Sequence, residues 1–205
     1  MLRVLHVGCA KERVVGRSEL FPAGKWVETR LDIDPSVKPD VVASMTDMSP
    51  VPDASCHAVY SSHNLEHLFP HELQQALTEF LRVLDPGGFL FARVPDLQLA
   101  SAAIAKGRAD EPLYESANGP ITPLDIVYGH RRSIAKGKVY MAHRNGFVFD
   151  SFGGALEAAG FVGIQVVREH YDLVGLGFKE FRRDTGPRLR QAVPKAAAPK
   201  AAAAL

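Results

Sequence analysis

The sequence predicts an α/β protein built on a doubly wound sheet. Short runs rich in β-branched and aromatic residues alternate with segments of helical periodicity, which is typical of strands joined by helical crossovers. Two further strand-like segments follow each other near the end of the chain and predict a closing antiparallel hairpin. Together these observations predict one domain over residues 1–183.

The segments with the composition of strands are separated by polar and turn-forming residues. The first five are residues 2–7, 27–33, 40–43, 57–62 and 89–94, and the closing pair is 161–170 and 175–183. Residues 10–26, between the first two strands, are polar and rich in turn formers. They fit either a short helix or a long loop.

Three helices are predicted between and after these strands. The clearest covers residues 70–84, because its apolar residues follow the i, i+3, i+4 spacing of one buried face. Pro70 suits its first turn, and Asp85-Pro86-Gly87-Gly88 predicts its end. The other two helices are expected over residues 96–106 and 150–159.

Two segments do not fit this alternation of strands and helices. Residues 107–149 have little periodicity and predict a lid or a substrate-recognition insertion. Within them, residues 126–149 contain several basic side chains and no acidic one, which fits a solvated loop or a lid that binds an anionic acceptor. Residues 184–205 are rich in Ala, Pro and Lys and predict a disordered tail.

The composition argues against several classes of protein. A net charge of +1 over 205 residues gives no global attraction for nucleic acid, which we do not expect as a partner. Cys9 and Cys56 are far apart and form no CxxC pair, so a disulfide framework is not predicted. Because the chain has neither a signal-peptide pattern nor an apolar run of roughly 18 residues, we expect a cytoplasmic protein without a membrane span.

Polar side chains follow three of the predicted strands at the point where each ends. Asp32 and Asp34 follow one, Asp47 follows the next, and Ser62 and His63 follow a third. In an open parallel sheet these strand ends form the ligand crevice. Successive acids there suit a ligand with ribose hydroxyls, an exocyclic amine and a positive charge, which describes S-adenosylmethionine better than a nucleoside triphosphate.

Five motifs occur along the chain in a fixed order. They are LHVGCA, LDIDP, PDVVASMTDM, HAVYSSHNLEHL and LRVLDPGG. This series resembles the class I S-adenosylmethionine-dependent methyltransferases, in particular a small bacterial branch with the pattern GCG, DIDP, HxLEH and LxPGG. The resemblance implies a Rossmann-like sheet of seven strands, mostly parallel, in which the last strand runs antiparallel.

The resemblance also implies which residues contact S-adenosylmethionine. The turn after the first strand would pass beneath the methionine part, and the acid after the second strand would bind the ribose hydroxyls. The acid after the third strand would accept a hydrogen bond from the adenine amine. The end of the fourth strand would lie beside the reactive methyl group. The expected cofactor-binding residues are Gly8, Ala10, Asp32, Ile33, Asp47, Met48, Ser62 and His63.

The first loop departs from the pattern of this family. Where the family has an acid followed by three alternating glycines, the chain reads His6-Val7-Gly8-Cys9-Ala10-Lys11-Glu12. Only the first glycine is present, and a histidine takes the place of the acid. This departure motivates an alternative function, a catalytically silent relative that binds a nucleoside or a protein partner.

Three histidines are candidates for catalysis, because an unperturbed imidazole titrates near neutral pH. They are His63, His130 and His143. The run His63-Asn64-Leu65-Glu66-His67 also matches a zinc-binding HxxEH motif. That motif needs both histidines on one long helix, whereas here a strand precedes it and Pro70 follows closely. We therefore expect no metal.

The expected activity is methyl transfer to an oxygen or nitrogen of a small-molecule or glycan-like acceptor. The acceptor is anionic if the basic segment binds it. A nicotinamide-dependent oxidoreductase is disfavoured because the first turn lacks GxGxxG. A nucleic-acid methyltransferase is disfavoured because no Asn/Asp-Pro-Pro-Tyr motif follows the fourth strand.

Overall fold

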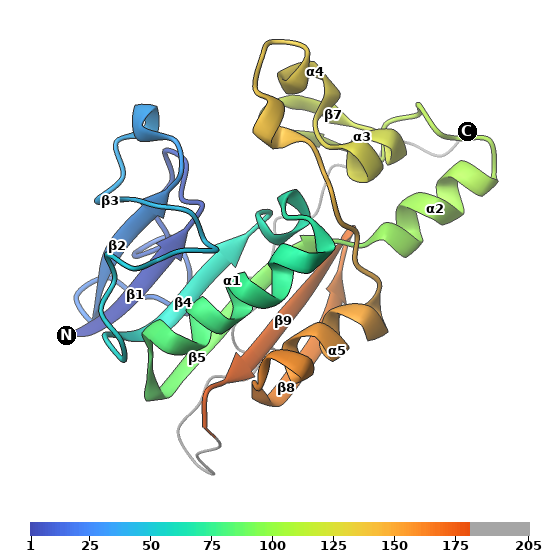
Figure 1. Cartoon of the computed structure of the whole chain (residues 1–205). Coiled ribbons are helices and arrows are strands. Elements are labelled where there is room, and N and C mark those ends of the chain that lie inside the picture. Colours follow the sequence, from blue (N-terminus) through green and yellow to red (C-terminus); the bar gives the residue numbers. More distant parts are fainter. Residues whose placement is uncertain (181–205) are drawn as a thin grey trace.

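A seven-stranded sheet forms the centre of the structure, a computed structural model that describes residues 1–180 (Figure 1). The strand order is β3-β2-β1-β4-β5-β9-β8. The end of the predicted strand 175–183, the domain boundary at residue 183 and the predicted tail 184–205 lie outside the described residues.

The sheet confirms the predicted fold class. Its strands are β1 (Leu2–Val7), β2 (Trp26–Asp32), β3 (Val41–Val42), β4 (Cys56–Ser62), β5 (Leu84–Pro95), β8 (Val162–Glu169) and β9 (Asp172–Phe178). The first five pair in parallel, whereas β9 lies antiparallel between β5 and β8. The last strand therefore runs against the others, as expected.

Two helices cover one face of the sheet, as Figure 1 shows for α1 (Pro70–Val83) and α5 (Phe149–Ala159). The main core lies between them and the sheet, and Leu77, Phe80 and Leu156 are among its fully buried side chains. The helix α1 begins where predicted, because the Glu72 carboxylate accepts the Phe69 N–H at 2.8 Å and Pro70 needs no acceptor.

A loop rather than a helix covers the opposite face near β1. Residues 8–25 connect β1 to β2 through turns, so the loop alternative holds for residues 10–26. Phe21 is fully buried and lies edge-on to Trp26, with ring centroids 5.0 Å apart, and stacks on Phe89 at 6.2 Å. This aromatic cluster attaches the loop to the sheet.

The expected insertion contains short regular elements beyond the carboxyl ends of the parallel strands, where Figure 1 groups β7, α3 and α4. It follows α2 (Leu97–Ala105) and packs on it through α3. The elements are the hairpin β6 (Tyr114–Ser116) and β7 (Gly119–Ile121), the helices α3 (Pro123–Tyr128) and α4 (Arg131–Ile134), and the 3-10 turn η3 (Val139–Met141). We call residues 107–149 the lid segment.

Two further 3-10 turns follow strands of the sheet. They are η1 (Pro35–Val37) after β2 and η2 (Leu65–His67) after β4. Among residues 1–180, no helix combines the length and apolar composition that crossing a membrane requires.

Removing the Phe21 ring tests whether the loop is attached through its aromatic cluster. We expect Phe21→Ala to lower the free energy of unfolding by about 3–5 kcal/mol, because a buried phenyl ring leaves a cavity. Phe149→Ala is the matched control, since Phe149 is 37% exposed and should lose much less. Urea unfolding measures both variants, and equal losses would contradict the proposed attachment.

Candidate functional site

A cavity of about 430 Å³ lies at the carboxyl ends of β1, β2 and β4. Its walls come from the loop after β1, the segment after β2, the residues that follow β3, the turn η2 and the lid segment. Six of the eight predicted cofactor-binding residues line it, namely Gly8, Ala10, Asp32, Ile33, Ser62 and His63. The strand ends of the sheet thus bring together residues that are far apart in the sequence.

Gly8 sits where the end of β1 meets the end of β4. Its φ of +62° is left-handed, and a Cβ there would lie 1.9 Å from the Asn64 Oδ1 atom. The Asn64 Nδ2 group donates to the Val7 carbonyl at 2.9 Å and to the Ser62 carbonyl at 3.1 Å. Asn64 therefore joins the two strand ends through the space that the missing side chain leaves.

Ala10 stands where the pattern of the resembled family has its second glycine. It also has a left-handed backbone, with a φ of +45°. Its N–H donates to Asp32 Oδ2 at 2.8 Å, and its carbonyl accepts from the Arg30 guanidinium at 2.6 Å. Asp32 Oδ1 accepts the Asp34 N–H at 2.9 Å. Two side chains from β2 thus hold Ala10 in a conformation that usually needs glycine.

His6 stands where the family pattern begins with an acidic residue, and a carboxylate from another residue lies beside it. Its Nδ1 atom lies 2.8 Å from Glu28 Oε1, and Glu28 also accepts the N–H groups of Val14 and Val15 at 3.1 and 3.2 Å. Burial lowers the pKa of His6 more than Glu28 raises it, so the ring is neutral and donates. Glu28 thus supplies the acceptor for this loop from the neighbouring strand.

Ile33 places an apolar surface beside the Asp32 carboxylate. It is 62% exposed and lines the cavity. The neighbouring Asp34 accepts from the Ser36 N–H at 2.8 Å and from the Tyr140 hydroxyl of the lid segment at 3.2 Å, and the hydrogen bonds with Ser36 lower its pKa most. The wall at β2 is therefore apolar and anionic.

The structure does not bring Asp47 and Met48 to the cavity. Met48 is fully buried in the main core, and its backbone is held there by the Glu79 carboxylate, which accepts its N–H at 2.6 Å, and by Arg82, which donates to its carbonyl at 2.8 Å. Asp47 accepts the Ser49 N–H at 3.1 Å. The residues that line the cavity in this segment are Ala43, Ser44, Met45 and Thr46.

His63 lines the cavity between two acids. Its Nδ1 atom lies 3.5 Å from Glu66 Oε1, and its Nε2 atom lies 3.5 Å from Asp172 Oδ2. Partial burial disfavours the charged ring, but these two carboxylates outweigh it and hold the pKa of His63 well above its usual range. This raised pKa favours the charged ring and disfavours a role for His63 as general base.

His130 and His143 do not line the cavity. The His130 Nδ1 atom lies 2.7 Å from Ser133 Oγ, within the lid segment. The His143 ring packs against that of His67, with centroids 5.0 Å apart. Its Nδ1 atom lies 2.7 Å from the Ile126 carbonyl. Burial lowers the pKa of His143.

Several cavity residues were not predicted from the sequence. They include Asn64, His67 and Glu72 near η2, and Lys138, Tyr140, Met141 and Arg144 on the lid segment. The basic run 126–149 was the available signal for the lid residues, and its two cavity-lining cations are Lys138 and Arg144. The Arg144 guanidinium lies 4.7 Å from the centroid of the Phe69 ring.

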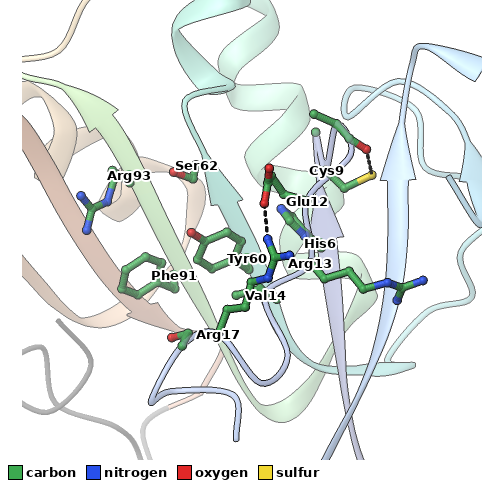
Figure 2. A pocket seen from close by; sticks show the side chains of 13 residues that line it. His6, Cys9, Glu12, Arg13, Val14, Arg17, Tyr60, Ser62, Phe91 and Arg93 are labelled. Carbon is green, nitrogen blue, oxygen red and sulfur yellow. Dashed lines mark hydrogen bonds and ion pairs between the residues drawn. The ribbon is translucent and has the colours of Figure 1, made fainter. Parts of the chain in front are cut away.

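A second cavity, of about 370 Å³, opens on the other side of the loop after β1. Figure 2 shows Tyr60 and Phe91 side by side on its floor, and their rings stack at 5.3 Å. Gly8, Ala10 and Ser62 border both cavities. The loop therefore separates two hollows that meet at the end of β4.

Residues 5–92 match a family model described as a methyltransferase domain. The matched segment contains the parallel strands whose ends form the cavity. No curated protein matches the sequence of this chain.

Solved structures share the fold at low sequence identity. One is the 1,6-didemethyltoxoflavin-N1-methyltransferase of Burkholderia thailandensis, which was solved with 1,6-didemethyltoxoflavin and S-adenosylhomocysteine. It is 17% identical, and the alignment covers 87% of this chain and 71% of that one with a TM-score of 0.55. A methyltransferase of Methanosarcina mazei is 14% identical, with 88% and 93% covered and a TM-score of 0.59. One of Aquifex aeolicus is 15% identical, with 86% and 81% covered and a TM-score of 0.53.

The matched domain and the fold together support S-adenosylmethionine as the cofactor and methyl transfer as the activity. The comparisons do not determine the acceptor.

Replacing Ala10 by glycine tests the description of the first loop. We expect Ala10→Gly to raise the free energy of unfolding by about 0.5–1 kcal/mol, since relief of a left-handed alanine outweighs the added chain entropy. Ala102→Gly, at an exposed position within α2, should lower it by about 1 kcal/mol. Thermal or urea unfolding measures both, and a loss of stability in Ala10→Gly would contradict the assigned conformation.

Proposed function

We propose that this chain transfers the methyl group of S-adenosylmethionine to an oxygen or nitrogen of a small, anionic acceptor, a glycan-like molecule included. The observation that carries the proposal is the arrangement of Asp32 and Ile33 beside the left-handed turn at Gly8 and Ala10, at the strand ends of a matched methyltransferase domain. A carboxylate suits the hydroxyl groups of a ribose, and the exposed apolar side chain next to it suits the flat base that the ribose carries.

The roles of the cofactor-binding residues follow from their places. Each Asp32 oxygen accepts one backbone N–H and retains a lone pair for a ribose hydroxyl. Ile33 packs on the adenine, and Ser44 and Thr46 offer hydroxyl groups to its polar edge. Asp47 and Met48 act indirectly, by fixing the segment that carries these hydroxyls.

The turn at Gly8 and Ala10 lies beneath the methionine part, and Ser62 and His63 face the methyl end. His63 lies between Glu66 and Asp172, which raise its pKa, so we assign it the positioning of these acids and not the removal of a proton. The cofactor supplies an activated methyl group. The chain has to align the acceptor with it and exclude water.

The loop geometry argues against a silent relative. The glycine that the family has at position 10 is replaced by an alanine that keeps the left-handed conformation, and Glu28 supplies a carboxylate beside the loop. The substitutions therefore preserve the shape of the turn.

The lid segment favours an anionic acceptor. Lys138 and Arg144 line the cavity, and the Tyr140 hydroxyl connects the lid to Asp34 across its mouth. Two cations on one wall match a carboxylate, sulfate or phosphate group. The size of the cavity, about 430 Å³, suits a small molecule together with the cofactor's reactive end.

Calorimetric titration with S-adenosylhomocysteine tests the cofactor site. We expect binding in the micromolar range, weakened at least about tenfold in Asp32→Asn because one ribose hydrogen bond of about 1.5–3 kcal/mol is lost. Asp53→Asn is the control, since Asp53 lies outside the cavity. No binding to the natural chain would refute the proposal, and binding without transfer to any acceptor would favour the silent relative.

Neutralising the lid cations tests the acceptor class. In a panel of phenols, amines and sugar acids, we expect Lys138→Met and Arg144→Met to raise the KM for anionic acceptors about tenfold each, with little change in cofactor affinity. Lys136→Met is the matched control, because Lys136 lies in the same segment but does not line the cavity. An unchanged KM in both cavity variants would contradict an anionic acceptor.

A further inference from the structure

Three side chains capable of binding a metal meet where η2 contacts the end of the lid segment. Glu66 and His67 come from η2, and His143 comes from the lid. One donor atom of each lies within 4.8 Å of the others. His67 also lines the main cavity, so this cluster adjoins the proposed acceptor site.

The Glu66 carboxylate is buried, and its only ion-pair contact among the described residues is a long one. The residue is 1% exposed, and neither of its carboxylate oxygens has a hydrogen-bond partner within residues 1–180. The His63 Nδ1 atom lies 3.5 Å from Oε1. Because an ionised carboxylate is costly to bury without close partners, this geometry points to a ligand that binds the free oxygens.

Each histidine has one ring nitrogen beside a backbone carbonyl. The His67 Nδ1 atom lies 3.1 Å from the Ala142 carbonyl, and the His143 Nδ1 atom lies 2.7 Å from the Ile126 carbonyl. A carbonyl only accepts, so each Nδ1 carries the proton and each Nε2 keeps a lone pair. Metal-binding histidines are oriented by this kind of contact to a backbone carbonyl.

Backbone contacts hold the cluster together. The N–H groups of Arg144 and Asn145 donate to the Glu66 carbonyl at 2.8 and 3.1 Å, and the His143 N–H donates to the Tyr128 carbonyl at 3.2 Å. These bonds fix the end of the lid against η2. Metal bonds of about 2.1 Å impose a donor separation of about 3.4 Å, and the donor atoms already lie within 4.8 Å of one another.

We infer that Glu66, His67 and His143 bind one divalent transition-metal ion of the zinc class. Two imidazoles and one carboxylate are a donor set for Zn²⁺ and its first-row neighbours, whereas Mg²⁺ and Ca²⁺ prefer oxygen ligands. Three protein ligands leave a position open, and one of them, His67, also lines the cavity. Metal binding at this site does not depend on the proposed methyl transfer.

An open metal position beside the cavity would bind an oxygen or nitrogen of the acceptor. This consequence alone depends on the proposed function. It would select acceptors with a hydroxyl, phenol or carboxylate group, because those groups coordinate a zinc-class ion.

Direct metal titration tests the inference. The natural chain without an affinity tag is treated with chelator, dialysed and titrated with Zn²⁺ by calorimetry, and with Co²⁺ by visible absorption. We expect one ion per chain, affinity at least about a hundredfold lower in Glu66→Gln and His143→Gln, and unchanged affinity in His71→Gln, an exposed histidine outside the cluster. No binding to the natural chain, or equal binding by His143→Gln, would overturn the inference.

A second measurement guards against loss of fold in the variants. Circular dichroism establishes that Glu66→Gln is folded, and Zn²⁺ should then raise the melting temperature of the natural chain but not that of the variant. Saturation by Mg²⁺ with no preference for Zn²⁺ or Co²⁺ would overturn the assigned metal class. Titration with S-adenosylhomocysteine in the same preparations is independent, so failure of the metal site is distinguishable from failure of the cofactor site.

Discussion

The loop after β1 keeps its shape because two carboxylates from the neighbouring strand hold its backbone. Glu28 accepts the N–H groups of Val14 and Val15, and Asp32 accepts that of Ala10. Parallel pairing of β1 with β2 places both carboxylates beside the loop. Since this loop borders both cavities, the shape of the strand-end region depends on these hydrogen bonds.

Most of the fold could be predicted from local patterns. The buried strands β1, β4 and β5 have apolar runs with polar ends, and the spacing of apolar residues in α1 specifies one buried face. The β3 region was harder, because a strand of two residues does not specify which following side chains face the cavity. The family resemblance implied that Met48 contacts the cofactor, whereas its side chain packs in the core.

The chemistry of the site depends on contacts that no local pattern contains. The pKa of His63 is raised in part because Asp172 comes from β9, and Glu66 lies near His143 because the lid segment ends beside η2. The HNLEH motif places its two histidines four residues apart, whereas the cluster at Glu66 takes its second histidine, His143, from the lid segment. Spacing within the motif could not reveal that cluster.

Residues 8–25 connect two strands through turns and are attached by a small set of hydrogen bonds and by Phe21. Such a segment opens at a lower free-energy cost than the paired strands beside it. Its amide hydrogens should therefore exchange with solvent well before those of β4 and β5. A ligand in contact with Gly8 and Ala10 would slow that exchange. The exchange rates of the loop amides would therefore report whether the cavity is occupied.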